Sequence, residues 1–440
     1  MRALTAILGT FVFAQAVGQE VMTLKAAIDY GRGHSPTMAM AANDRLKADA
    51  VAQEAVSGYL PQINGSGQLD DNLKRQTTIL PAGTFGEEPT AIQFGTQYST
   101  TLSVTAEQTL IDVAQLNGIQ ANKPNLAMAD IKLEQAEEQM VYAVAQAYIH
   151  AQTYAEQVRL LEENLLQYEE LVPILRLREE KGVAQALDVD RLEVTRSNIA
   201  SQLALARADH EVAVAQLKRA MGMPLGTPLA IAEVERDQVD MRKPSPNGFE
   251  LDRVLGHQLN TQTELLYSID LKRKRNAFLP TLSAYGRYGA QAMGNELAGS
   301  FDNTFDYATV GLKLNVPLFS GLRRSSQIKQ SEIALENLRE QQRDADLGFE
   351  LDYRNADTRL LATDYTVQND ERNLDLAQQV FENTNLQYQQ GMASLSDLLN
   401  AEYQLKEARN NWTTSLLNHS MAILDLEKAK GTLLDYVNTL

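Results

Sequence analysis

The 440-residue sequence contains no cysteine, so it can form no disulfide and cannot carry a lipid anchor on an N-terminal cysteine. It also lacks, after its first residues, any run of about 18 consecutive apolar residues, the length that a membrane-spanning helix needs. If the chain enters a membrane, we therefore expect it to do so as a closed β-barrel, the other structure that satisfies its backbone hydrogen bonds in lipid.

Positive charge is scarce as well. The formal net charge is −17, which argues against nucleic acid as a partner. The five histidines never occur at metal-ligand spacing, so we expect no metal, no cofactor and no enzyme activity. One basic run, Lys272-Arg273-Lys274-Arg275, stands out from this background. Its simplest interpretation is the solvated face of a helix.

Residues 1–18 have the pattern of a secretory signal peptide. Arg2 is followed by an apolar stretch from Ala3 to Ala14, and small residues at 14–18 fit a cleavage site. The alternative is a short buried N-terminal helix. We expect the mature protein to be exported and to begin near residue 19.

An internal duplication organises the remaining sequence. Gly182 and Asp188 recur as Gly391 and Asp397, with the same offset of 209 residues (391 − 182 and 397 − 188). In each copy the glycine can close the end of one helix and the aspartate can cap or brace the next. We therefore predict two structural repeats, residues 19–222 and 249–440, with elbows at 182 and 391. A proline-containing linker, residues 223–248, joins them.

Each repeat also contains a predicted pair of strands. A helical arm ends at a Leu-Pro dipeptide (Pro61 and Pro280), and strand pairs are expected at about 62–108 and 281–316. Residues 94–104 alternate with a period of two over the length of a tilted membrane strand, with Phe94, Tyr98, Leu102 and Val104 among the even positions and Gly, Gln, Ser and Thr at the odd ones. Because a barrel needs about eight strands, four strands require several copies to share one wall, and the sequence does not fix their number. A soluble sandwich is the alternative, for which four strands are few.

Long helices follow the strands. Between Gly321 and Gly391 lie 69 residues without proline, and apolar or aromatic residues recur at every seventh position. This spacing predicts coiled-coil packing against neighbouring helices. The members of this heptad stripe are Tyr353, Leu360, Val367, Leu374, Phe381 and Tyr388, with first-repeat equivalents that include Val144, Ala151 and Val172.

In its signal peptide, duplicated repeats, strand pairs and long helices, the chain resembles the TolC family of outer-membrane efflux and secretion channels. The most specific motif is the second elbow, Tyr388-x-x-Gly391-x5-Asp397-Leu398-Leu399-Asn400-Ala401. The resemblance implies a homotrimer with a shared 12-stranded β-barrel in the outer membrane. It also implies an α-barrel of long helices that extends into the periplasm, contact with outer-membrane lipid, and two partners, a periplasmic adaptor (membrane fusion) protein and an inner-membrane transporter.

The resemblance also assigns roles at the elbows. Asp397 would line the narrowest ring of the entrance as an ion filter, and Asn400 would occupy a second ring position that is acidic in the family. Tyr388 would bond Asp188 as an iris latch. The elbow glycines Gly182 and Gly391 would contact the adaptor. Ala393 replaces a family arginine, so fewer bonds would hold the closed state.

The implied function is a passive exit duct of a tripartite efflux pump or a type I secretion system. The alternatives are an exported coiled-coil scaffold and a passive porin. A simple cap of the return helix is the alternative role for Asp397. The sequence does not distinguish among drugs, metals and proteins as the exported substrate.

Overall fold

The computed structural model describes residues 21–80, 90–232, 248–302 and 304–439. The predicted signal peptide and most of the predicted linker lie outside these ranges. The described chain forms two compact units, and each unit draws segments from both sequence repeats. One unit comprises residues 44–130 and 259–343, and we call it the strand unit. The other, which we call the helical unit, comprises residues up to 43, 131–258 and 344–440.

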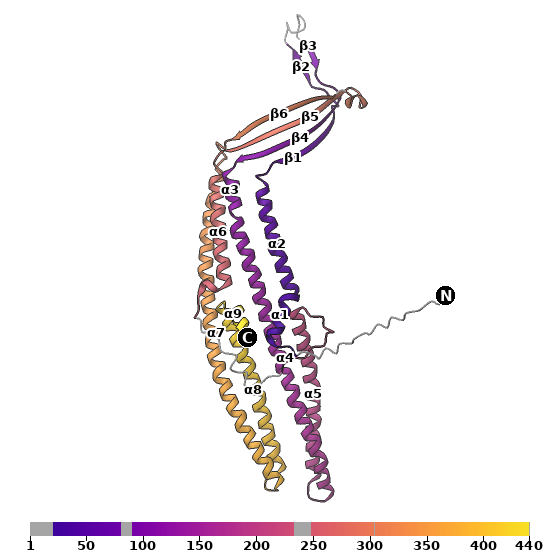
Figure 1. Ribbon diagram of the computed structural model, residues 1–440, viewed down its shortest axis with the longest axis vertical. Helices are drawn as coiled ribbons and strands as arrows, with labels where there is room; N and C mark the ends of the chain where they lie inside the picture. Colours follow the sequence, from indigo (N-terminus) through magenta and orange to yellow (C-terminus); the bar gives the residue numbers. More distant parts are fainter. Residues whose placement is uncertain (1–20, 81–89, 233–247, 303, 440) are drawn as a thin grey trace, which may run out of the picture. The chain divides into compact units, whose positions relative to one another are not determined.

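The strand unit is built around one antiparallel sheet. Its strands are β1 (Gln62–Asp71), β4 (Tyr98–Ile111), β5 (Thr281–Gly294) and β6 (Thr304–Asn315). They are hydrogen-bonded in the order β1-β4-β5-β6 (Figure 1). Pairing of β4 with β5 thus joins the two predicted strand pairs into a single sheet, with β1 and β6 at its edges.

Two details of the strand prediction were wrong. The strand expected at 94–104 begins only at Tyr98, because Gly95 has a left-handed φ of 88° that interrupts the extended backbone. The sequence near residues 74–92 is polar and contains glycine and proline, which predicts a loop between the two strands of the first pair. The structure instead has two short paired strands there, β2 (Thr77–Leu80) and β3 (Thr90–Gln93).

The two faces of the four-stranded sheet differ in chemistry. Side chains paired directly across the strands share a face, and one face carries exposed apolar residues, among them Val104 (51% exposed) and Val310 (87% exposed). The same face includes Ile63, Leu69, Leu102, Tyr288, Leu312 and Leu314. The opposite face is mainly polar, with hydrogen bonds such as Arg287 to Thr105 (3.3 Å). An apolar face of this extent is the mark of an interaction surface rather than of a free monomer.

Within the described residues, no helix combines the length and the apolar composition needed to cross a membrane.

Helices flank the sheet in the sequence and run on into the helical unit. The arms are α1 (Leu24–His34), α2 (Pro36–Ser57) and α6 (Leu255–Asn276). After the strands come α3 (Val113–Gln120), α4 (Asn122–Glu180) and α7 (Arg323–Gln389), and the return helices are α5 (Ala186–Met221) and α8 (Leu395–Ala429). At about 1.5 Å per residue, the 59 residues of α4 and the 67 of α7 span roughly 90 and 100 Å along their axes.

In the helical unit, α4 pairs with α5 and α7 with α8 as two helical hairpins (Figure 1). The predicted heptad positions face inward: Val144 and Ala151 are fully buried, and Leu360, Val367 and Leu374 are buried too. On α8, Leu398, Leu405, Trp412 and Leu426 are buried in the same way. The seven-residue spacing therefore does mark the packing stripe of each hairpin.

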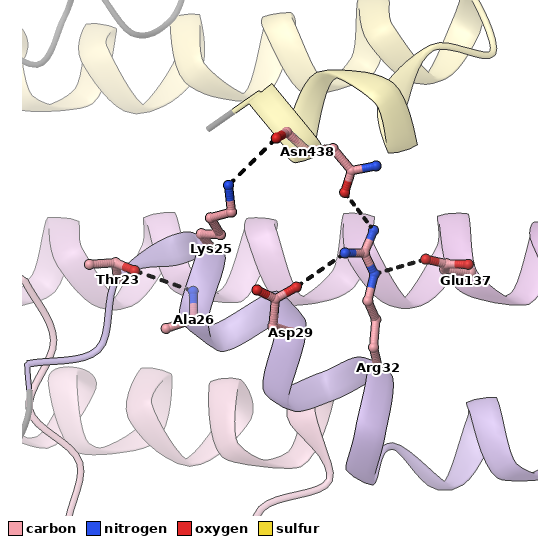
Figure 2. Close-up of polar contacts among 7 residues, drawn as sticks. All are labelled: Thr23, Lys25, Ala26, Asp29, Arg32, Glu137 and Asn438. Carbon is pink, nitrogen blue, oxygen red and sulfur yellow. Dashed lines mark hydrogen bonds and ion pairs between the residues drawn. The ribbon is translucent and has the colours of Figure 1, made fainter.

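One arginine connects three helices of this unit. Arg32 of α1 binds Glu137 of α4 at 2.8 Å and donates to the Asn438 Oδ1 of α9 (Leu433–Thr439) at 3.1 Å (Figure 2). Its third contact is Asp29, one turn earlier on α1, at 3.1 Å. Because all three contacts meet at one guanidinium, α1 and α9 are fixed to α4 by directional bonds as well as by apolar packing.

Four glycines end four helices with the same left-handed geometry. The elbow glycines Gly182 and Gly391 have φ of 74° and 75°, and the glycines that end the return helices, Gly222 and Gly431, have 76° and 70°. At the elbow glycines, an added Cβ would meet nothing within 4 Å. At Gly222 and Gly431 it would lie 2.4 Å from the backbone oxygens of His34 and Arg253. The second pair is thus needed for close backbone packing as well as for φ.

This contrast predicts unequal effects of two otherwise similar substitutions. Gly391→Ala should cost about the 1–2 kcal/mol of a left-handed residue with a side chain. Gly431→Ala should cost clearly more, because backbone atoms must also shift. Thermal unfolding followed by the helical circular-dichroism signal measures both, and equal decreases in Tm would contradict the packing role of Gly431.

Candidate functional site

The second elbow begins α8 with a reciprocal cap. The Ser394 Oγ accepts from the Asp397 backbone N–H at 3.2 Å, while the Asp397 Oδ2 accepts from the Ser394 N–H at 3.0 Å and from the Ser394 Oγ at 2.6 Å. This is a capping box, which satisfies two otherwise unpaired groups at a helix start. The hydrogen bonds from Ser394 lower the pKa of Asp397, so the carboxylate remains ionised.

Asp397 is therefore a helix cap in a single chain, but it is also exposed. Both bonds from Ser394 are received by Oδ2, so the cap does not use Oδ1. The capping role and a role at a pore entrance are compatible, since one oxygen serves the cap. Asn400, nearly one turn later, is exposed as well, whereas Leu395 and Leu398 of the same turn are buried.

Tyr388 and Asp188, the expected latch residues, lie in different surroundings. Tyr388 is half-buried and packs against the apolar cluster of the first helical hairpin, with the Arg178 guanidinium 5.9 Å from its ring centroid. Asp188 is in the first turn of α5 and pairs with Arg191 at 3.7 Å. Among the described residues of this single chain, no hydrogen bond joins Tyr388 to Asp188.

A polar link between the two hairpins was not anticipated from the sequence. The Tyr168 hydroxyl of α4 donates to the Glu402 Oε2 of α8 at 2.5 Å, and the Lys406 Nζ, one turn further along α8, donates to the Gln202 Oε1 of α5 at 2.6 Å. Tyr168 is 5% exposed. Together these contacts connect α8 to both helices of the first hairpin.

Burial controls the charge states in this link. Burial raises the pKa of Glu402, against the opposing effects of the Tyr168 hydrogen bond and of Lys406. Burial likewise lowers the pKa of Lys406, and Glu402 opposes that shift. For Tyr168, burial and the neighbouring carboxylate both raise the pKa. The Tyr168 hydroxyl therefore keeps its proton and donates it in the hydrogen bond to Glu402. The ionised form of Glu402 is stabilised by this hydrogen bond.

The duplication shows why this link was missed. Glu402 aligns with Glu193 at the offset of 209, but Tyr168 aligns with Ala377. Glu193 instead forms a surface ion pair with Arg176 inside its own hairpin. The sequence shows that Glu193 and Glu402 align. It does not show that Glu193 pairs with Arg176 and Glu402 with Tyr168, because these partners depend on how the hairpins pack.

Comparison with known proteins identifies the family. A family model described as outer membrane efflux protein matches residues 28–223 and 265–432. The chain belongs to this outer membrane efflux protein family.

Individual relatives are distant. The chain is 26% identical over 327 residues to the outer membrane efflux protein BepC of Brucella suis biovar 1 (strain 1330). This match covers 74% of this chain and 66% of BepC. It is 27% identical over 247 residues to the alkaline protease secretion protein AprF of Pseudomonas aeruginosa, covering 54% of this chain and 50% of AprF. The matches thus span about two thirds and half of these relatives' lengths.

Solved structures show the same fold. The outer membrane protein VceC of Vibrio cholerae superposes with a TM-score of 0.70 at 18% identity, covering 93% of this chain and 96% of that one. At this identity the likeness concerns the arrangement of the backbone, and it supports the predicted combination of long helices with a strand region.

The Tyr168–Glu402 link generates a pH-dependent prediction. Tyr168→Phe removes the hydrogen bond that lowers the pKa of Glu402, so this pKa rises further above its unfolded value. A raised carboxyl pKa contributes stability that is present at low pH and is lost as pH rises through the folded-state pKa. We expect Tyr168→Phe to cost about 1–3 kcal/mol at neutral pH and less near pH 4.

Thermal unfolding at several pH values measures this difference. Tyr403→Phe is the matched control, because Tyr403 is on α8 beside Glu402 and is 65% exposed. A loss for Tyr168→Phe that does not grow with pH would show that Glu402 does not depend on the tyrosine.

Proposed function

We propose that this protein is the outer-membrane exit duct of an export system, extending into the periplasm, and that it catalyses no reaction. The observation that supports this most directly is the presence in one chain of an exposed apolar sheet and two long helical hairpins. A coiled-coil scaffold would have no need of the sheet, and a simple porin would have no need of the hairpins. The family membership reported above agrees with this proposal.

The sheet also supports a homotrimer. Its edge strands β1 and β6 leave backbone donors and acceptors unpaired, which proteins normally cover. Three copies would supply twelve strands, enough to close a barrel. Large apolar side chains that remain exposed on the helices, such as Leu205, Leu361 and Tyr365, would then pack against neighbouring copies.

The names of the relatives indicate the class of process in which this protein would take part. The names of BepC and AprF refer to efflux and to protease secretion, and both processes export material through the outer membrane. A passive duct contains no energy source, so we propose that an inner-membrane transporter drives export and that a periplasmic adaptor contacts the elbows at Gly182 and Gly391.

We further propose that the elbows form the constriction of the duct. Symmetry would place three copies of Asp397 around one axis, with Asn400 beside them as an uncharged ring. Tyr388 and Asp188 would form the latch as the elbows close together in the trimer. The exposed Asp397 carboxylate and the position of Tyr388 against the first hairpin support this arrangement.

Cell fractionation followed by planar-bilayer recording tests the proposed function. We expect the protein in the outer-membrane fraction, a trimer by light scattering after detergent extraction, and discrete channel currents. A stable monomer in the soluble periplasmic fraction would favour the scaffold and overturn the proposal.

Two substitutions separate the filter role of Asp397 from its capping role. Asp397→Asn keeps an oxygen for the cap but removes the charge, whereas Ser394→Ala breaks the capping box and keeps the carboxylate. If Asp397 faces the pore, Asp397→Asn should reduce the cation preference and the block by trivalent cations, and Ser394→Ala should retain both. Reversal potentials in a salt gradient measure the preference. Equal values for wild type and Asp397→Asn would remove this residue from the pore.

A further inference from the structure

Basic side chains gather at one place in this acidic protein. They belong to the last turn of α6 and the beginning of α7, the two helices that precede β5 and follow β6. We call this set the basic collar: Lys272, Arg273, Lys274, Arg275, Arg323, Arg324 and Lys329. Its excess of positive charge contrasts with the net charge of −17 for the whole chain.

The two parts of the basic collar are side by side in the strand unit. The Lys274 Nζ donates to the Ser331 Oγ at 2.6 Å, and the Arg275 guanidinium pairs with Glu332 at 2.8 Å. The Arg324 guanidinium lies 5.7 Å from the ring centroid of Phe278. These contacts place the end of α6 against the start of α7.

Acidic residues neutralise only part of the basic collar. Asp270 pairs with Arg273 and Lys274, each at 2.8 Å, while Glu332 pairs with Arg275 and with Lys329 at 3.8 Å. Two carboxylates thus serve four cations. Within the described part of the chain, Lys272, Arg323 and Arg324 have no ion-pair partner.

The first repeat lacks basic residues at the corresponding positions. At the equivalent positions of the first repeat, offset by 219 residues in the arm and 209 after the strands, the sequence has no basic residue. Those positions are Gln53, Glu54, Ala55, Val56, Ala114, Gln115 and Gln120. Moreover, Arg323 and Arg324 open α7, where the positive end of the helix dipole disfavours cations. A local structural role therefore does not account for Arg323 and Arg324, whereas Lys274 and Arg275 also hold the end of α6 against the start of α7.

Exposed apolar side chains flank the basic collar. Leu318 and Phe319, which connect β6 to α7, are 91% and 85% exposed, and Leu322 is exposed directly before Arg323. A surface cavity of about 510 Å³ opens nearby, lined by Arg273 and Lys274 together with small and uncharged side chains and the Asp112 carboxylate that caps α3. Apolar residues beside basic ones suit a membrane interface, where acyl chains meet phosphate groups.

We propose that the basic collar binds anionic phospholipid headgroups of the leaflet on the helix side of the sheet. The inference rests on the proposed function, because it requires the apolar face of the sheet to be in lipid. Arginine binds phosphate through two parallel N–H donors, and Lys272, Arg323 and Arg324 are the residues with donors to offer. The basic collar would thus fix the depth of the sheet in the membrane from one side.

Lipid titration of the purified trimer tests this proposal. Phosphatidylglycerol and phosphatidylcholine are added separately to the detergent-solubilised protein, and bound lipid is counted by native mass spectrometry. We expect wild type to bind phosphatidylglycerol at least about tenfold more tightly, on the basis of the attraction of each basic residue to anionic lipid. The triple variant Lys272→Gln, Arg323→Gln, Arg324→Gln should lose most of this preference.

Two controls keep the result specific. Arg339→Gln, Arg343→Gln, Arg354→Gln removes the same charge from further along α7 and should keep the preference, as should Arg323→Lys with Arg324→Lys. No preference in wild type, or the same loss in the distant triple variant, would overturn the proposal. A protein that never enters the membrane fraction would instead refute the proposed function.

Discussion

The two open edges of the four-stranded sheet are the constraint on which the remaining structure depends. β1 and β6 each present unpaired backbone groups, and the apolar face between them is exposed, with Val310 at 87%. Neither feature is stable in water for a single chain. Association of copies around a common axis would satisfy the edges and would leave the apolar face to lipid. It would also bring the helical hairpins of neighbouring copies together.

The two repeats share the same backbone arrangement, but their side chains form different contacts. The same left-handed glycine ends both elbows, and the same close glycine contact ends both return helices. Yet in the described residues the second elbow has a capping box and the first does not, and Glu402 has a tyrosine partner in the other hairpin whereas its counterpart Glu193 pairs with Arg176. The basic collar likewise belongs to the second repeat alone. Through such differences, the two halves of a duplicated protein can acquire separate roles.

Features that depend on local sequence were predictable, and those that depend on packing between segments were not. Heptad spacing identified the packing stripe from Tyr353 to Tyr388, whose central members Leu360, Val367 and Leu374 are buried, because that spacing is a property of a single helix. The Leu-Pro dipeptides marked the strand starts. In contrast, the start of β4 depended on the conformation of Gly95. The Tyr168–Glu402 link required knowledge of which helices face each other, and the sequence offered only the alignment of Glu402 with Glu193. The role of Asp397 as a cap was one of two predicted alternatives, and a single chain shows the cap directly.

Disulfide trapping tests directly whether the sheet closes between copies, because the chain has no cysteine of its own. One cysteine is placed in β1 at Ser66 and a second in β6 at Tyr307, Thr309 or Gly311, so that three registers are sampled. Within one copy β4 and β5 separate these strands, by about 14 Å at normal strand spacing, which is too far for a disulfide. If β1 of one copy pairs with β6 of the next, at least one register gives covalent dimers and trimers on a denaturing gel after oxidation. Monomer alone in every register, with both thiols open to alkylation, would contradict this pairing.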